Sequence, residues 1–252
     1  MVIVKVKKPL AVVFDFCGTA ARDTFVEKTL QPYFKLAYKA YFEANWSKEE
    51  CQADAKALAA VAAKDAAAPK IDLTAAKQEQ IAALAKYVEY CGANKKDTSK
   101  AFVMYRFHVW FDGYDRGKLT TPVYSDVAVH IQKWKTELQL KLFIFSNGWT
   151  EATKKFMSKT SHGDLNALID DHFDTSLGSL KDAATYRKLI ERIKEDPKEV
   201  TFLTKSASEG KAAKAAGLNV VLVLTHTATV EAVSTSCKDI PIARSFTQVE
   251  FI

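Results

Sequence analysis

The run LAVVFDFCGT at residues 10–19 decides the fold of this chain. It is a continuous apolar stretch that ends at Asp15 and Phe16 and then meets Gly18 and Thr19. Such a run is typical of a parallel strand that is buried on both faces and followed by a turn at its carboxyl end. We therefore predict a central strand at residues 10–16, with Asp15 at its end.

Further apolar runs of this kind lie at residues 140–145, 200–203 and 220–224, each followed by a turn and a helical stretch. Strands that alternate with helices predict an α/β protein with a parallel, doubly wound sheet. Right-handed crossovers then bring the carboxyl ends of the strands to one edge, where ligands bind.

The sequence between the first two strands is helical in character. Residues 22–45 are rich in aromatic side chains, and residues 48–67 are rich in alanine, which favours helices. Pro69 interrupts this pattern, and Asp72 or Thr74 is placed to cap the next helix, which runs to residue 90. Further helices are expected at 101–114 and 123–134. We predict a core formed by residues 1–22 and 120–252, with an all-helical cap inserted at 23–119.

Composition and hydropathy exclude several classes of protein. The 252 residues, 48% hydrophobic and 26% charged, suit an ordinary globular protein with a sizeable core. No apolar run reaches the ~18–20 residues that cross a bilayer, and the first residues lack the pattern of a cleaved signal peptide. We therefore expect a cytoplasmic protein that does not bind membranes.

Charge and cysteine usage narrow the range of partners. The net charge is only +6, and the lysines are spread over many segments, which argues against a nucleic-acid-binding surface. The four cysteines and five histidines show neither disulfide nor zinc-ligand spacing. The charge favours at most a small anionic ligand, such as a phosphate ester.

Three predicted strand ends carry residues that can hold a phosphoryl group. Asp15 ends the first strand, Ser146, Asn147 and Gly148 follow the second, and the run TKS at 204–206 follows the third. Asp can serve as a nucleophile, while a hydroxyl and backbone amides stabilise the phosphoryl oxygens. Asp15 could also be a simple turn-capping acid, because an acid before a glycine turn is common.

These motifs resemble those of the haloacid dehalogenase (HAD) superfamily, and within it the enolase-phosphatases, or acireductone synthases. The resemblance covers nearly the whole chain. It includes FDFCGTA at the first strand and FVEKTLQPYFKLAY at the entry to the cap. It continues through IFSNGWTEATKKF, SHGDLNALIDDHFDTSLG and FLTKSASEGKAAKAAGLNVVLV, in the family order. The resemblance implies a HAD-like core with a helical cap, an aspartate nucleophile at Asp15 and a catalytic magnesium ion.

Two departures from the family pattern bear on function. The family's general acid, two residues after the nucleophile, is replaced here by Cys17, whose thiol is a weak proton donor with an ordinary pKa near ~8.5. The magnesium-binding Asp after FLT is replaced by Lys205, whose ammonium has no lone pair and repels a cation. A magnesium ion could then use only Asp15 and the Cys17 backbone. Opposite charges ~4 Å apart attract by ~4 kcal/mol at an effective dielectric near ~20, so we expect Lys205 to pair with Asp15.

A third departure concerns the phosphate-binding lysine of the family. Leu180 occupies its position, and Lys181 beside it is the candidate replacement. Ser146, Gly148 and the downstream acid Glu209 match the family pattern. Simpler interpretations remain open: Cys17 as a small buried thiol, Lys205 as a solvated surface lysine, and His108 and Trp110 as packing residues of the cap.

From these residues we predict a divergent member of the family with a degenerate magnesium site and no resident cofactor. It is expected to be a catalytically impaired phosphatase with a binding or regulatory role, and to be a monomer. The alternative is an active magnesium-dependent enolase-phosphatase of methionine salvage that acts on 2,3-diketo-5-methylthiopentyl-1-phosphate. A third possibility is a protein that acts only through protein–protein contacts of its cap.

Overall fold

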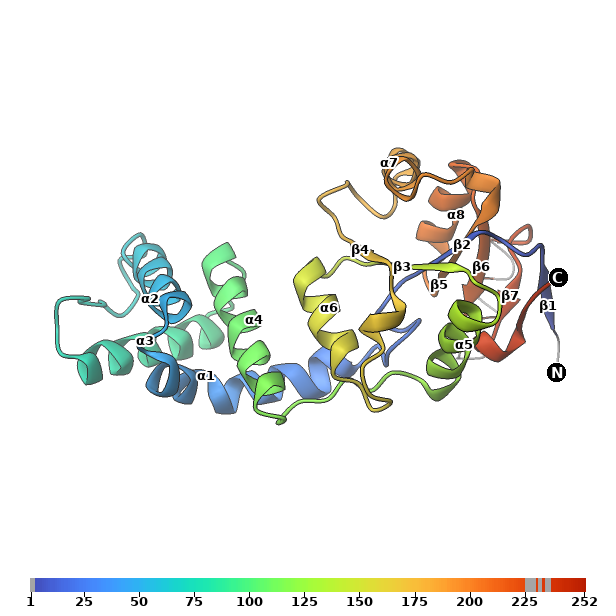
Figure 1. Ribbon diagram of the computed structural model, residues 1–252. Helices are drawn as coiled ribbons and strands as arrows, with labels where there is room; N and C mark the ends of the chain where they lie inside the picture. The colour runs from blue at the N-terminus through green and yellow to red at the C-terminus, as the bar shows by residue number, and fades with distance from the viewer. Residues whose placement is uncertain (1–2, 225–229, 231–232, 234–236) are drawn as a thin grey trace. The chain divides into compact units, whose positions relative to one another are not determined.

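A computed structural model describes residues 3–224, 230, 233 and 237–252 (Figure 1). Parts of the predicted core range, residues 1–2 and most of 225–236, therefore lie outside the described residues. The chain divides into two compact units. One unit is formed by Met1–Phe25 and Thr120–Ile252, and the other by Val26–Leu119.

The first unit is built on a parallel sheet of strands in the order β4-β3-β2-β5-β6-β7. Every neighbouring pair is parallel, as the continuous apolar runs predict. The strands are β2 (Ala11–Phe14), β3 (Lys141–Phe145), β4 (Asp171–Phe173), β5 (Val200–Thr204), β6 (Asn219–Val223) and β7 (Ile242–Ala243). A second, two-stranded parallel sheet joins β1 (Val4–Val6) to β8 (Val249–Phe251).

Helices cover both faces of the large sheet (Figure 1). They are α5 (Ser125–Thr136), α6 (Thr150–Ser158), α7 (Ala183–Ile193) and α8 (Ala207–Ala215). Short 3-10 turns lie at Asn166–Leu168, Pro197–Glu199 and Phe246–Gln248. Successive residues of a strand point to opposite faces. Val13 therefore packs with the cluster under α7 and α8, whereas Phe14 contacts Phe246, which stacks on Trp134 of α5.

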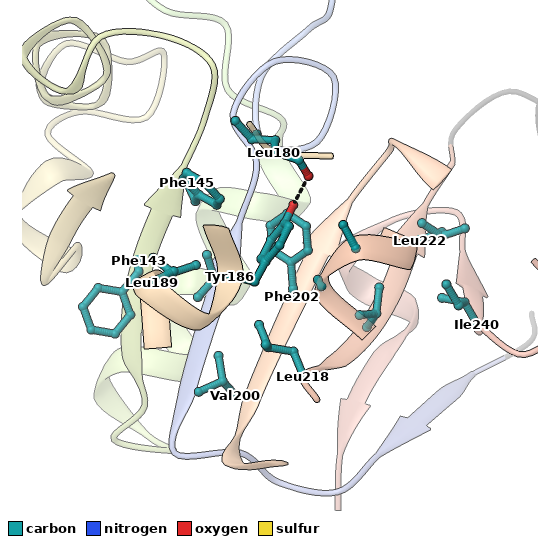
Figure 2. Packing of buried hydrophobic residues seen from close by; sticks show 14 of the residues in the cluster. Phe143, Phe145, Leu180, Tyr186, Leu189, Val200, Phe202, Leu218, Leu222 and Ile240 are labelled. Carbon is teal, nitrogen blue, oxygen red and sulfur yellow. Dashed lines mark hydrogen bonds between the residues drawn. The ribbon is translucent and has the colours of Figure 1, made fainter. Parts of the chain in front are cut away.

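A hydrophobic core cluster lies between the sheet and helices α7 and α8 (Figure 2). Tyr186 is its central large side chain, with its ring centroid 5.5 Å from that of Phe145 and 5.3 Å from that of Phe202. The buried Tyr186 hydroxyl donates a hydrogen bond of 2.8 Å to the Leu180 carbonyl oxygen. This bond fixes the loop before α7 against the core.

The second unit is formed entirely by helical segments. A five-residue π-helical turn, η1 (Val26–Leu30), leads into α1 (Gln31–Asn45), which is followed by α2 (Glu49–Ala62), α3 (Lys77–Ala93) and α4 (Lys100–Asp115). Its interior is aromatic, as the sequence predicts: Tyr105 stacks on Phe42 at 4.7 Å between ring centroids and donates a hydrogen bond to the Tyr38 carbonyl oxygen. Neither Asp72 nor Thr74 caps α3, which begins after Ala76; Asp72 instead accepts hydrogen bonds from Thr74.

A charged cluster ties three helices of this unit together. His108 Nδ1 on α4 lies 2.9 Å from Asp54 of α2, and His108 Nε2 lies 3.5 Å from Glu50. The Tyr41 hydroxyl of α1 donates to Asp54, which is only 5% exposed. Burial alone would lower the pKa of His108, but its hydrogen bond to the Asp54 carboxylate and the charges of Asp54 and Glu50 outweigh burial and raise the pKa.

This cluster predicts a pH-dependent stability that the variant His108→Gln removes. Because the pKa of His108 is raised in the folded state, its stabilisation is fully present below ~6.5, the unfolded value, and is lost as pH rises through the folded value. At pH 6 we expect His108→Gln to lower the free energy of unfolding by about 1.5–3 kcal/mol, the range for hydrogen bonds to charged groups, and by less at pH 9. Urea unfolding at both pH values measures this, and an equal loss at both would contradict the prediction.

All four cysteines are free thiols, in agreement with the predicted absence of a disulfide framework. Across the part of the chain that the structure describes, no helix combines the length and the hydrophobicity required to span a bilayer.

Candidate functional site

The ends of three adjacent strands place the predicted site residues together in the first unit. In the sheet, β2 lies between β3 and β5, and Phe14 is in register with Ile144 on one side and Leu203 on the other. Asp15 therefore lies one residue beyond this common register, with Ser146 and Lys205 two residues beyond it on the flanking strands. Neighbouring strands are about 4.8 Å apart, so the three loops form one edge of the sheet.

Asp15 is buried, with 8% of its surface exposed, at the centre of this edge. Its Oδ1 accepts a hydrogen bond of 2.7 Å from the Phe16 amide. Burial raises the pKa of the Asp15 carboxyl to about 7, and the charge of Glu209 acts in the same direction. The Phe16 amide, Lys205 and Thr19 act in the opposite direction. The carboxyl is therefore a group whose charge changes near neutral pH.

Cys17 stands in the turn that follows Asp15. Burial raises the pKa of its thiol to about 11, with the charge of Asp15 adding to the rise and that of Lys205 opposing it. The thiol is therefore protonated at neutral pH and gives up its proton only reluctantly, so it cannot replace a carboxylic acid as proton donor. The same high pKa makes it a poor nucleophile.

Lys205 is the first residue after β5, and its side chain lies across Gly18. A Cβ atom placed on Gly18 would be 2.7 Å from the Lys205 Cε atom, so a larger residue there would displace the lysine side chain; the φ of +83° at Gly18 favours glycine. The Lys205 amide donates a hydrogen bond of 3.0 Å to Thr19 Oγ1, which joins the two loops. Thr19 and Gly18 belong to the motif at residues 10–19, but no pattern in the sequence predicts these contacts.

The expected direct ion pair between Lys205 and Asp15 is absent among the described contacts, and that prediction was wrong. Lys205 is exposed, and its ammonium acts on the pKa of Asp15 through space, without a hydrogen bond. The Asp15 carboxylate is buried and accepts the Phe16 amide, whereas the Lys205 side chain is exposed and lies on the turn at Gly18. Moving the ammonium to the buried carboxylate would cost its hydration free energy.

Ser146 is nearly inaccessible, with 1% of its surface exposed. Its amide donates to the Phe173 carbonyl oxygen, and its Oγ accepts a hydrogen bond of 3.3 Å from the Gly148 amide. Asn147 between them is exposed. The Ser-Asn-Gly loop thus directly precedes α6, with Ser146 held at its start.

Lys181 and Glu209 also belong to this edge. The charges of Lys181 and Lys205 both lower the pKa of Glu209, although burial raises it overall. The Glu209 carboxylate accepts a hydrogen bond of 2.9 Å from Thr204 Oγ1. Leu180, in contrast, is buried in the core, so it is the exposed Lys181 that brings a positive charge near this cluster.

A magnesium ion does not fit the residues that the structure places here. Mg²⁺ requires an octahedral shell of oxygen ligands, usually with one or two carboxylates. Among the described residues, no three His, Cys, Asp or Glu side chains lie close enough together to hold a metal ion, so magnesium would depend on one or two carboxylates at this edge. Glu209 is engaged by Thr204, and Lys205 brings a positive charge to the same edge. Asp15 is left as the only carboxylate of the central turn.

A separate cavity of the first unit is not part of this site. It lies beside β4 and α7, is lined by residues such as Thr150, Asp174 and Arg192, and includes none of the predicted site residues. The Asp174 carboxylate is already used in this cavity, because it accepts a hydrogen bond of 3.1 Å from the Thr150 amide.

Comparison with known proteins places this geometry in context. No family model matches the chain. The chain is 32% identical to enolase-phosphatase E1 of Danio rerio over 94% of its own length and 93% of that protein. The crystal structure of the UTR4 protein of Saccharomyces cerevisiae matches 96% of the chain and all of that protein, with a TM-score of 0.72 and 20% identity. The putative HAD-hydrolase YfnB of Bacillus subtilis, bound to magnesium, covers 96% of the chain with a TM-score of 0.51 and 14% identity. The two structures show the fold alone.

Proposed function

Because this chain belongs to the enolase-phosphatase family of the HAD superfamily, we propose that it is an anion-binding member whose magnesium-dependent phosphatase activity is impaired. The proposal is carried by one observation, the position of Lys205 at the carboxyl end of β5. Its side chain lies across Gly18, and its charge reaches Asp15. A cation therefore occupies the region in which the family resemblance implies a magnesium ligand.

Cys17 supports the same proposal from the chemistry of the leaving group. Hydrolysis of a phosphate ester needs a proton for the departing alkoxide, and a positioned acid contributes roughly 100–10,000-fold to the rate. A thiol with a pKa of about 11 cannot make this contribution at neutral pH. Even if Asp15 attacked a phosphoryl group, no general acid would protonate the departing alkoxide.

In this proposal the chain keeps the residues that can bind an anion. Ser146 and Gly148 form the loop after β3, and Lys181 and Lys205 bring positive charge to the same edge. The protein would then bind a small phosphate-bearing or other anionic ligand and act through binding or regulation rather than turnover.

The second candidate function is an active enolase-phosphatase of methionine salvage that acts on 2,3-diketo-5-methylthiopentyl-1-phosphate. It is favoured by the 32% identity to enolase-phosphatase E1 of Danio rerio over nearly the full length. It is also favoured by the retained Asp15 at the end of β2. In this case the metal and the proton donor would have to come from groups other than residues 205 and 17.

Hydrolysis of p-nitrophenyl phosphate by the purified chain, with EDTA or with magnesium chloride, separates the two candidates. We expect no turnover in magnesium beyond that of the matched variant Asp15→Asn. Magnesium-dependent turnover that disappears in Asp15→Asn would refute the impaired function and support the active enzyme.

A further inference from the structure

The sheet edge of the first unit carries four charged groups whose signs balance. Asp15 and Glu209 are the two carboxyls, and the charge of Glu209 acts with burial to raise the pKa of Asp15. Lys205 acts on both of them, and Lys181 acts on Glu209. An arriving anion therefore does not face an excess of negative charge at this edge.

The Ser146 hydroxyl is a hydrogen-bond donor at this edge, and among the described residues it donates to no acceptor. Its side chain is 1% exposed, and its Oγ accepts a hydrogen bond from the Gly148 amide. Among the described residues, no acceptor receives the hydroxyl proton of Ser146. A buried polar hydrogen without a partner costs about 1–3 kcal/mol, so its presence points to a ligand oxygen as its acceptor.

The sheet register places Ser146 and Lys205 at the same edge of the sheet. Ser146 and Lys205 follow the two strands that flank β2, at equal distances beyond the common register of Phe14. Their backbones are thus separated by two strand spacings, or about 10 Å. A lysine side chain spans roughly 6 Å, and the one at 205 lies across the β2 turn at Gly18, on the strand between the two loops.

From these observations we propose that Lys205 is the resident counter-ion of a phosphate-binding site, so that the site takes a phosphate group without a divalent cation. The ligand class is an inorganic phosphate or a phosphate monoester. The Ser146 hydroxyl donates to one of its oxygens, and the Lys205 ammonium neutralises its charge. This inference rests on the proposed function, because it describes the anion that the impaired site would hold.

A lysine suits this role for physical reasons. The ammonium is a compact charge with three donors on a flexible stem, and it reaches a phosphate oxygen without a fixed geometry. Lys205 is exposed in the structure, so its ammonium keeps its hydration until an anion arrives. Charge-assisted hydrogen bonds of this kind are roughly twice as strong as neutral ones.

Isothermal titration calorimetry of inorganic phosphate into the full chain tests the proposal. We expect saturable binding in EDTA, and the same dissociation constant when magnesium chloride replaces EDTA. Lys205→Met should weaken binding about tenfold or more, and Ser146→Ala should weaken it as well, whereas Lys205→Arg should retain most of the affinity. The matched control is Lys211→Met, which removes an equal charge from an exposed position on α8.

Several results would overturn the proposal: no phosphate binding in EDTA, binding that requires magnesium, or equal affinities for Lys205→Met and Lys211→Met. If Lys205→Met does not fold by its circular dichroism melt, Lys205→Gln serves in its place. The hydrolysis assay of the proposed function is read separately. A chain that neither hydrolyses the aryl phosphate nor binds phosphate overturns this inference and leaves the impaired phosphatase activity standing, whereas magnesium-dependent turnover with magnesium-dependent phosphate binding overturns both.

Discussion

The double variant Cys17→Glu with Lys205→Asp is expected to bind Mg²⁺ at least about a hundredfold more tightly than the natural chain. In the natural chain Asp15 is the only carboxylate of its turn, and Lys205 brings a positive charge to it. The double variant replaces this cation with a carboxylate and adds a second acid to the turn. At ~4 Å a unit charge pair is worth ~4 kcal/mol at an effective dielectric near ~20, so reversing the sign at one position readily exceeds the ~2.7 kcal/mol that a hundredfold gain requires.

Calorimetric titration of Mg²⁺ into both proteins measures this gain. The control is Lys211→Asp, which makes the same change of charge as Lys205→Asp, but on an exposed face of α8, and should leave magnesium affinity unchanged. No gain in the double variant would show that the edge of the sheet has lost more of the magnesium site than residues 17 and 205.

The variant Phe202→Ala is expected to lower the free energy of unfolding by about 3–5 kcal/mol, the usual range for truncation of a buried Phe. Phe202 lies in the middle of β5, is 0% exposed and packs on Tyr186 (Figure 2). The truncation leaves a cavity between the sheet and α7 that the strand backbone, held by β2 and β6, cannot close.

Denaturant unfolding of Phe202→Ala and of Tyr186→Phe tests this picture of the core. Tyr186→Phe keeps the ring but removes the hydrogen bond to the Leu180 carbonyl oxygen, so a loss of only about 1 kcal/mol is expected. A loss below about 1 kcal/mol for Phe202→Ala would contradict the tight packing of this core.

The strands at the centre of the sheet could be predicted because parallel strands buried on both faces have continuous apolar runs. The predicted run at 200–203 corresponds to β5, and the run at 10–16 contains β2. Strand β4, in contrast, spans only Asp171–Phe173 and contains a charged residue and a histidine. It is defined by its pairing with β3, which no local pattern encodes.

Helix ends were predicted less well, because several residue types can cap a helix or form a local turn. Asp72 and Thr74 both had the side chains of an N-cap, yet they hydrogen bond to each other in a turn before α3. The helix begins after Ala76 without a side-chain cap. An Asp carboxylate can cap a helix or accept hydrogen bonds in a local turn, and the surrounding chain determines which of the two it does.

At the candidate site, the sequence predicted which residues share the sheet edge but not how they contact one another. Parallel strand topology alone places Asp15, Ser146 and Lys205 at one edge. The direction of the Lys205 side chain depends on the space above Gly18 and on the hydration of the ammonium, which one-dimensional patterns do not record. For this reason the sequence predicted the shared edge of the sheet, whereas the predicted ion pair between Asp15 and Lys205 was wrong.

The most direct measurement is a calorimetric titration of Mg²⁺ into the natural chain, repeated with Asp15→Asn. If Lys205 stands in place of the metal, neither protein should give a saturable binding signal at millimolar Mg²⁺. Saturable binding of one magnesium ion by the natural chain that is lost in Asp15→Asn would contradict the central claim.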